Sequence, residues 1–210
     1  MSPTTHSESR PGLRQRKKAD AMRRIQHAAL DLFEEQGYQN VTIEQIARAA
    51  ETSPSSVYRY FGTKEQLVLH DDYDPQLLAF LAAAPGTVVE ALETMRVGMA
   101  SIMAGWESGE VDDIARRLRL MLDEDSVHAA MTLQMAEFES LVHSALAARG
   151  EGGSAAGNEG LRTRMIAAMV VAGLVAAIRH WAEAGYSDRL AGMLDEAMAT
   201  IIRAVRAIEG

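Results

Sequence analysis

The residues whose types and spacing are best suited to chemistry are Ser55, Ser56 and Arg59, directly after Pro54. Hydroxyl groups donate and accept hydrogen bonds, and a guanidinium can donate two parallel bonds to the edge of a guanine. We therefore expect Arg59 to read a base and the two serines to act as weaker readers. The rival interpretation is that Arg59 is only a solvated surface residue.

Two short helices must position these side chains. Thr42 is the expected N-cap of a helix over 43–50, and Ser53, followed by Pro54 at the first helical position, is the expected N-cap of a helix over 54–61. Only a tight turn separates the two helices. This pattern predicts a helix-turn-helix, whose second helix enters the major groove of DNA.

A longer helix is expected before this motif, from Lys17 to Gln36, with Gly37 as its C-terminal stop. Residues 1–16 have almost nothing to bury and predict a flexible basic arm. Such an arm would meet phosphates or the minor groove, or serve only to solubilise the protein. We place the DNA-binding domain at 17–67 and a second domain at 68–210.

The charge distribution agrees with this division. The chain carries a net charge of −8, which by itself argues against a polyanionic partner. Residues 1–67, however, hold 10 Lys and Arg against 8 Asp and Glu, whereas residues 68–210 hold 11 against 21. The acidic surplus therefore lies outside the predicted helix-turn-helix.

Residues 37–67 resemble the DNA-binding domain of the TetR family of transcriptional regulators. The matching residues are Gly37, Tyr38, Thr42, Ile46, Ala47, Ala50, Ser53, Val57, Tyr58, Arg59, Tyr60, Phe61, Lys64, Glu65 and Leu67. The resemblance implies a homodimer that binds a palindromic operator on double-stranded DNA, more often as a repressor, and that responds to a small-molecule effector.

The resemblance also implies that Thr42, Tyr58, Tyr60 and Lys64 contact phosphates, where helix N-termini attract anions as well. With the readers named above, the expected DNA-binding set is Thr42, Ser53, Pro54, Ser55, Ser56, Tyr58, Arg59, Tyr60 and Lys64. Tyr58 and Tyr60 have the alternative role of packing aromatics.

Two positions depart from the family pattern. Glu51 stands where the family usually has a glycine in the turn, and we expect it to adopt a positive φ at some cost and to bring a carboxylate near phosphate. Ser55 stands where a glycine is common early in the reading helix. A serine there limits how closely the helix backbone can approach DNA, but it adds a hydroxyl donor.

The whole chain predicts an all-α fold of about nine helices, with the helix-turn-helix domain followed by a helical bundle for ligand binding and dimerisation. Thr63 should cap a further helix, and Pro75 should either break it or begin a new segment. The remaining helices are expected at 87–108, 111–124, 126–149, 161–184 and 188–208, with a Gly-rich loop over 150–160.

Methionines are concentrated in the second domain, and their flexible thioethers suit a cavity that accepts varied apolar ligands. The residues that we expect to contact an effector are Met99, Met103, Trp106, Arg119, Met135, Phe138 and Met169. The rival interpretation for each methionine is ordinary core packing.

Residues 114–120 faintly resemble TetR regulators whose second domain binds acyl-CoA-like ligands, which implies that Arg116, Arg117 or Arg119 pairs with ligand phosphates. A solvated basic face is the alternative. The apolar faces of the last two helices suit a four-helix dimer interface or the monomer's own core. The predicted effector is a small apolar or acyl-type molecule.

Several classes of protein are disfavoured. The chain has no cysteine, its histidines lack metal-ligand spacing, and we expect neither a metal nor a cofactor. The absence of a nucleophile elbow or a phosphate loop argues against an enzyme. The apolar run over 165–178 is too short to cross a bilayer, so we expect a cytoplasmic protein without membrane contact. The alternative to a regulator is a helical small-molecule-binding protein with weak or lost DNA binding.

Overall fold

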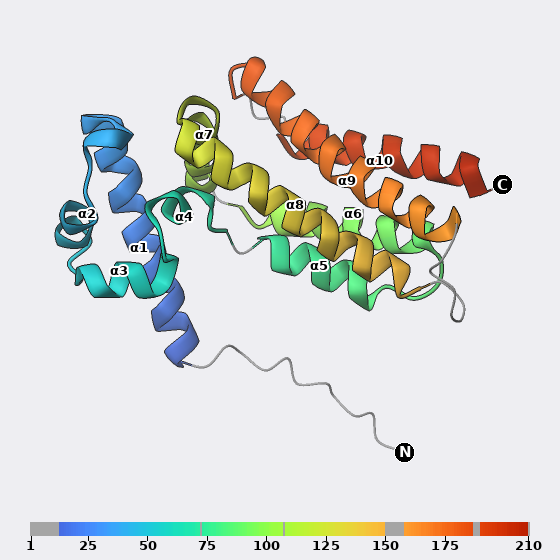
Figure 1. Cartoon of the computed structure of the whole chain (residues 1–210), viewed down its shortest axis with the longest axis horizontal. Helices are drawn as coiled ribbons and strands as arrows, with labels where there is room; N and C mark the ends of the chain where they lie inside the picture. Colours follow the sequence, from blue (N-terminus) through green and yellow to red (C-terminus); the bar gives the residue numbers. More distant parts are fainter. Residues whose placement is uncertain (1–12, 72, 107, 150–157, 187–189, 210) are drawn as a thin grey trace. The chain divides into compact units, whose positions relative to one another are not determined.

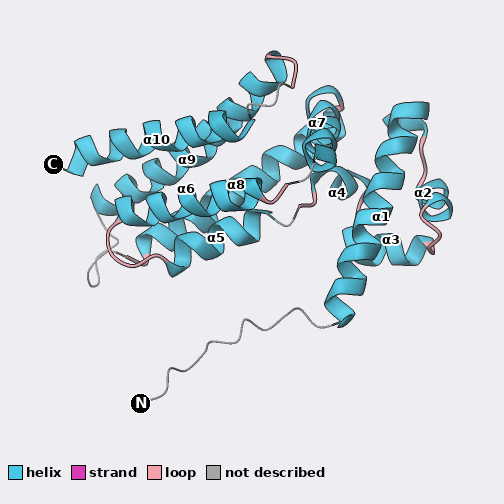
Figure 2. Ribbon diagram, turned by 180° about the vertical axis from the view of Figure 1, so that it is seen from behind, coloured by secondary structure: helices cyan, strands magenta, loops and turns pink. Residues whose placement is uncertain are grey.

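The computed structural model describes residues 13–71, 73–106, 108–149, 158–186 and 190–209. These residues form ten α-helices and one short 3-10 turn, with no strand among them (Figures 1 and 2). The chain divides after Val68 into two compact units. The all-α prediction is confirmed.

The first unit holds α1 (Leu13–Gln36), the 3-10 turn η1 (Tyr38–Asn40), α2 (Ile43–Ala49) and α3 (Pro54–Phe61), and α4 (Lys64–Leu69) begins in it. Its core joins α1 to the two short helices through buried apolar side chains, including Ile25, Phe33, Ile46, Val57 and Phe61. Gly37 ends α1 with a φ of +81°, as expected of a C-terminal stop.

The predicted caps of the short helices are present. The Thr42 hydroxyl accepts a bond from the Gln45 N–H at 3.3 Å, and the Gln45 side chain accepts one from the Thr42 N–H at 2.7 Å. The Ser53 hydroxyl accepts from the Ser56 N–H at 3.2 Å, with Pro54 at the first helical position. Local capping therefore fixes where both helices begin.

The second unit is a bundle of α5 to α10. Its helices are α5 (Tyr73–Ala83), α6 (Val88–Ala104), α7 (Ser108–Asp123), α8 (Asp125–Ala147), α9 (Asn158–Glu183) and α10 (Leu190–Glu209). Close packing of α9 on α10 uses Gly173, where an added Cβ would lie 2.6 Å from the Ile201 Cδ1 atom. Leu92, Met95, Leu146, Trp181 and Ile202 are among the fully buried core residues.

Some expected boundaries were wrong. Helix α1 begins at Leu13 rather than Lys17, because residues 13–18 are good helix formers; 1–12 of the expected arm lie outside the described residues. The described residues form ten helices, in keeping with the expected nine or so, and of the two alternatives for Pro75 the structure shows a new segment, the separate helix α5. The Asp71 carboxylate accepts bonds from the Tyr73 and Asp74 N–H groups at the start of that helix. Helix α9 begins at Asn158, within the expected Gly-rich loop, whose residues 150–157 lie outside the described residues.

Candidate nucleic-acid interface and effector cavity

Helix α3 presents a connected group of polar side chains on its solvent side. Val57 and Phe61 are buried and hold the opposite side of the helix against the core. The Ser53 hydroxyl lies 2.9 Å from the hydroxyls of both Ser55 and Ser56, and the Arg59 Nη2 donates to the Ser56 hydroxyl at 3.2 Å. The core contacts thus set which side chains α3 presents to a partner.

Arg59 is exposed but ordered by its neighbours. It also donates to the Tyr60 hydroxyl at 3.3 Å, and its guanidinium carbon lies 4.9 Å from the centre of the Tyr60 ring. We call Ser53, Ser55, Ser56, Arg59 and Tyr60 the reading cluster. These contacts restrict the Arg59 side chain, which would lower the entropic cost of the predicted contact with a base edge.

The tyrosines of α3 differ in their surroundings. The Tyr58 side chain is 51% exposed, which argues against the packing role for it, whereas Tyr60 is half-buried beneath the Arg59 guanidinium. Both hydroxyls are of the kind that contacts phosphate oxygens. The phosphate contacts themselves stay predictions.

Thr42 and Lys64 lie at helix starts, as expected. Thr42 is exposed, but its hydroxyl already accepts the α2 capping bond. The Lys64 ammonium donates to the Tyr38 carbonyl and lies 4.2 Å from the centre of the Tyr38 ring. The phosphate contacts of both residues stay predictions.

The turn between α2 and α3 holds Glu51 at a φ of +51°, which confirms the conformation expected from its departure from glycine. The Thr52 N–H donates to the Ala47 carbonyl at 2.8 Å, and the Arg24 Nε donates to the Ala50 carbonyl at 3.2 Å, so α1 supports the turn. The Glu51 side chain itself is exposed.

Replacing Glu51 by glycine should stabilise the first unit by about 0.5–1 kcal/mol, because glycine adopts a positive φ without the Cβ clash. Removal of the carboxylate should also raise DNA affinity by about two- to fivefold. Urea denaturation and a DNA-binding titration measure the two effects. The matched control, Glu51→Gln, should raise DNA affinity without the gain in stability; equal stability of the Gly and Gln variants would contradict the strain argument.

The second unit holds a partly open cavity of about 220 Å³ between its helices. Its wall is largely apolar and includes five methionines: Met99, Met103, Met121, Met131 and Met135. Five of the seven expected effector contacts lie in this wall: Met99, Met103, Trp106, Met135 and Phe138. Their contact with an effector stays a prediction.

The other two expected effector contacts, Arg119 and Met169, lie outside this wall. The α7 residues in the wall are Ile114, Arg117, Leu118, Met121 and Leu122, at helical spacing. Arg119 therefore points away from the cavity, and its guanidinium carbon lies 4.5 Å from the centre of the Tyr186 ring. Met169 precedes the α9 residues of the wall, which begin at Val171, by about half a turn, and it packs against the core instead.

Polar groups also line the cavity, and three of them were not expected from the sequence. Tyr73 and Asp74 from α5 and Gln134 from α8 lie in the wall with the expected Trp106, which follows α6, and we call these four residues the polar corner. The Tyr73 and Trp106 rings lie 5.2 Å apart, and the Gln134 side chain hydrogen-bonds to the Asp74 carboxyl group. In the sequence, Tyr73 and Asp74 directly precede Pro75, and this position was the signal that could have identified them.

The Asp74 carboxyl group is electrostatically unusual. Burial, followed by repulsion from Asp71, raises the pKa of Asp74 to about 6, although the Gln134 hydrogen bond acts in the opposite direction. A carboxylate that is even partly buried destabilises the folded state when it is ionised. Its presence in a cavity wall is therefore more typical of a binding site than of a structural core.

Asp74→Asn should raise the free energy of unfolding by about 2 kcal/mol at pH 8, with no effect near pH 4. The folded pKa lies above the unfolded value of 3.8, so the folded protein binds the extra proton and loses stability as the pH rises from about 4 through 6. Urea denaturation at the two pH values measures the difference. An equal effect at both pH values would show that ionisation is not the cause.

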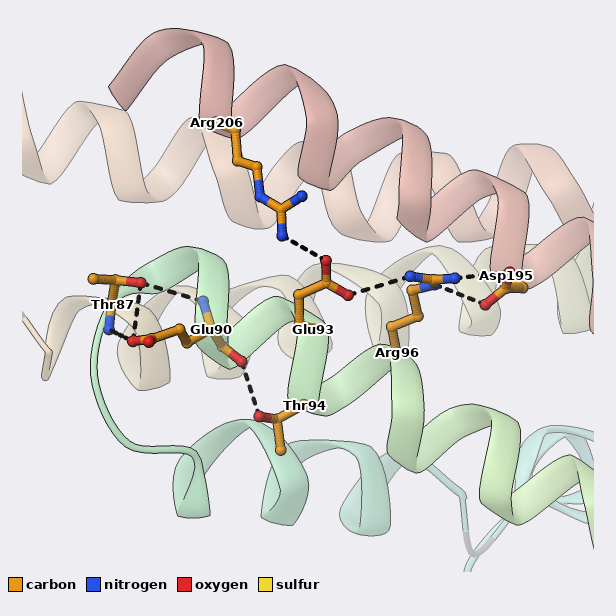
Figure 3. A network of polar contacts seen from close by, with 7 residues as sticks. All are labelled: Thr87, Glu90, Glu93, Thr94, Arg96, Asp195 and Arg206. Carbon is orange, nitrogen blue, oxygen red and sulfur yellow. Dashed lines mark hydrogen bonds and ion pairs between the residues drawn. The ribbon is translucent and has the colours of Figure 1, made fainter. Parts of the chain in front are cut away.

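An ionic network connects α6, whose inner side lines the cavity, to α10 (Figure 3). The Arg96 guanidinium donates to both Asp195 oxygens, at 2.7 and 3.1 Å, and to Glu93 at 3.2 Å. The Arg206 Nη2 completes the network with a 2.8 Å bond to Glu93. Asp195 has a lowered pKa because Arg96 donates to its charged form. A displacement of α6 would therefore strain its contacts with α10.

Comparison with known proteins assigns both units. Residues 25–70 match the model of bacterial regulatory proteins of the tetR family, and residues 89–206 match the MftR C-terminal domain. The chain is 32% identical over 123 residues to the HTH-type transcriptional regulator TcmR of Streptomyces glaucescens, covering 57% of this chain and 54% of that protein. It is 33% identical over 104 residues to the HTH-type transcriptional repressor Rv3405c of Mycobacterium tuberculosis, covering 47% and 55%.

The chain thus spans about half the length of the curated relatives it matches. Among solved structures, the fatty acid degradation regulator FadR from Bacillus halodurans aligns with a TM-score of 0.58 and 18% identity, covering 87% of this chain and 94% of that one. The SmeT–triclosan complex aligns with a TM-score of 0.56 and 18% identity, covering 86% and 91%. These structural likenesses concern the fold.

Proposed function

This chain belongs to the TetR family of bacterial regulatory proteins, and we propose that it is a homodimeric transcriptional repressor that binds a palindromic operator and is released by a small-molecule effector. The observation that carries the proposal is the reading cluster on the exposed side of α3, within the region that matches the family. The curated relatives are named as transcriptional regulators, not enzymes. A repressor of this kind would act on operator DNA in the cytoplasm.

We propose that α9 and α10 form the dimer interface. By length and composition α9 is apolar enough to cross a membrane. Only 28% of its most apolar 18-residue stretch is buried within the chain, so much of this apolar surface is uncovered. Leu161 and Met165 are 60% and 56% exposed. A second copy of the same two helices would cover this apolar surface, and the resulting two-fold symmetry would match a palindromic operator.

The effector occupies the cavity of the second unit in this proposal. SmeT, which shares the fold, was solved in complex with triclosan, a precedent for a small apolar ligand in such a regulator. For an acyl-type effector with phosphates, Arg117 is the best placed of the three arginines considered from the sequence, because it lies in the wall. Arg116 instead donates to Asp113 at 3.3 Å, and Arg119 lies over Tyr186.

Gel-shift titration of the protein against DNA from upstream of its own gene tests the proposal. We expect specific binding that weakens by at least about tenfold between 50 and 200 mM salt, because phosphate contacts release counterions. Absence of specific binding at low salt would reject the regulator and favour the alternative, a helical small-molecule-binding protein without DNA binding.

Charge placed on α9 tests the dimer interface. Ala172 and Ala176 are exposed on α9, and replacing both by glutamate should convert a dimer into a monomer in sedimentation velocity, because like charges would be buried in the interface. The matched control is Ala136→Glu on the exposed side of α8, which should leave the mass unchanged. A variant that stays dimeric would place the interface elsewhere.

A further inference from the structure

We propose that the effector is an apolar molecule that carries a basic amine, and that the polar corner binds its ammonium group between the Asp74 carboxylate and the rings of Tyr73 and Trp106. The inference rests on the proposed role of the cavity as the effector site and specifies the chemistry of its ligand. Neither the family matches nor the relatives assign a role to these residues.

The geometry of the polar corner suits a cation. The Tyr73 and Trp106 rings lie 5.2 Å apart and are tilted by 51°, so they form an angled aromatic wall. Asp74 follows Tyr73 directly in the first turn of α5 and lies in the same wall. Aromatic faces attract cations through their quadrupoles, and a carboxylate beside them adds a full negative charge.

The other charged groups of the wall are already engaged or exposed. The Asp71 carboxylate accepts the two N–H bonds that cap α5, and Arg117 donates to the His70 carbonyl at 2.8 Å. Arg179 is exposed. Of the described charged side chains, Asp71 is the one that acts on Asp74, and it repels. An ammonium group would relieve this repulsion, whereas a ligand carboxylate or phosphate at the same place would increase it.

Trp106 supports a polar ligand at this end of the cavity. Its indole N–H is buried and finds no hydrogen-bond partner among the residues that the structure describes. A buried donor without a partner is unfavourable, so an acceptor oxygen on the ligand would stabilise the complex. The rest of the ligand would contact apolar side chains, including those of Met99, Met103 and Phe138.

Three probes of similar shape test the charge preference: 1-(1-naphthyl)ethylamine, 1-(1-naphthyl)ethanol and 1-naphthylacetic acid. They are titrated by calorimetry into the full-length protein at pH 8, where the amine is protonated and the acid ionised. We expect the amine to bind at least about tenfold more tightly than the alcohol, and the acid to bind most weakly. Asp74→Asn should lower amine affinity about tenfold without changing that of the alcohol.

Trp106→Leu is the second variant. It should lower the affinity for the amine more than the affinity for the alcohol, because the aromatic face is lost. Equal or tighter binding of the alcohol or the acid, or an amine preference that survives in Asp74→Asn, would overturn the inference while leaving the proposed repressor intact. Failure of all three probes to bind a protein that still shifts operator DNA would overturn both the inference and the assignment of the cavity as the effector site.

Discussion

Replacing Tyr58 and Arg59 together by alanine should weaken operator binding by about 100-fold. A bidentate arginine–guanine contact contributes about 1–3 kcal/mol of discrimination, and loss of a phosphate contact adds about 1 kcal/mol. Both side chains are exposed on α3, whereas the buried side of that helix uses Val57 and Phe61. The fold should therefore be retained while recognition is lost.

Gel-shift titration measures this loss, with circular dichroism as the check on folding. Arg119→Ala is the matched control, because it removes the same charge from an exposed position on α7. We expect the control to bind operator DNA within about twofold of the unmodified protein, since its charge is remote from the reading cluster in sequence and unit. Unchanged affinity in the double variant would mean that α3 does not read the operator.

Trp181→Ala should lower the free energy of unfolding by about 3–5 kcal/mol, the loss typical of a large buried aromatic. The Trp181 side chain has 0% exposure and meets the Tyr186 ring edge-to-face at 5.1 Å. The Arg119 guanidinium lies over the other ring of this contact, that of Tyr186, so the stack of Trp181, Tyr186 and Arg119 joins the end of α9 to α7. Truncation would leave a void at the buried end of this stack, where Trp181 contacts Tyr186.

Urea denaturation at fixed protein concentration measures the loss, because dimerisation would make stability depend on concentration. Val97→Ala is the control: Val97 is 66% exposed on α6, and its truncation should change stability by less than about 0.5 kcal/mol. A loss below about 1 kcal/mol in Trp181→Ala would contradict the packing described for this residue.

The parts of the fold that sequence predicted correctly are those with local causes. Thr42 and Ser53 cap their helices through hydrogen bonds to residues three positions away, and Gly37 ends α1 through its own backbone conformation. Each of these features is encoded within a few neighbouring residues, so a single sequence suffices to predict it. The positive φ of Glu51, by contrast, was expected from the resemblance to the family, which usually has a glycine at that place in the turn.

The cavity depends on causes that are not local. The rotation of α7 about its axis decides that Arg117 faces the cavity and Arg119 does not, and this rotation is set by packing between helices. The pKa of Asp74 is raised chiefly by burial, which depends on how α5 packs in the bundle. The same packing brings the Gln134 side chain of α8 to the Asp74 carboxyl group. Spacing along the chain identifies neither relation.

The five methionines of the cavity wall can serve as built-in NMR probes of ligand binding. Each thioether ends in a methyl group that gives a sharp NMR signal when labelled with ¹³C, and the neighbouring Trp106 and Phe138 rings shift such signals according to their geometry. Movement of these methyl signals would therefore reveal where an effector binds and how fast it exchanges. Such a measurement requires no operator DNA, and it can screen candidate effectors of any chemical class.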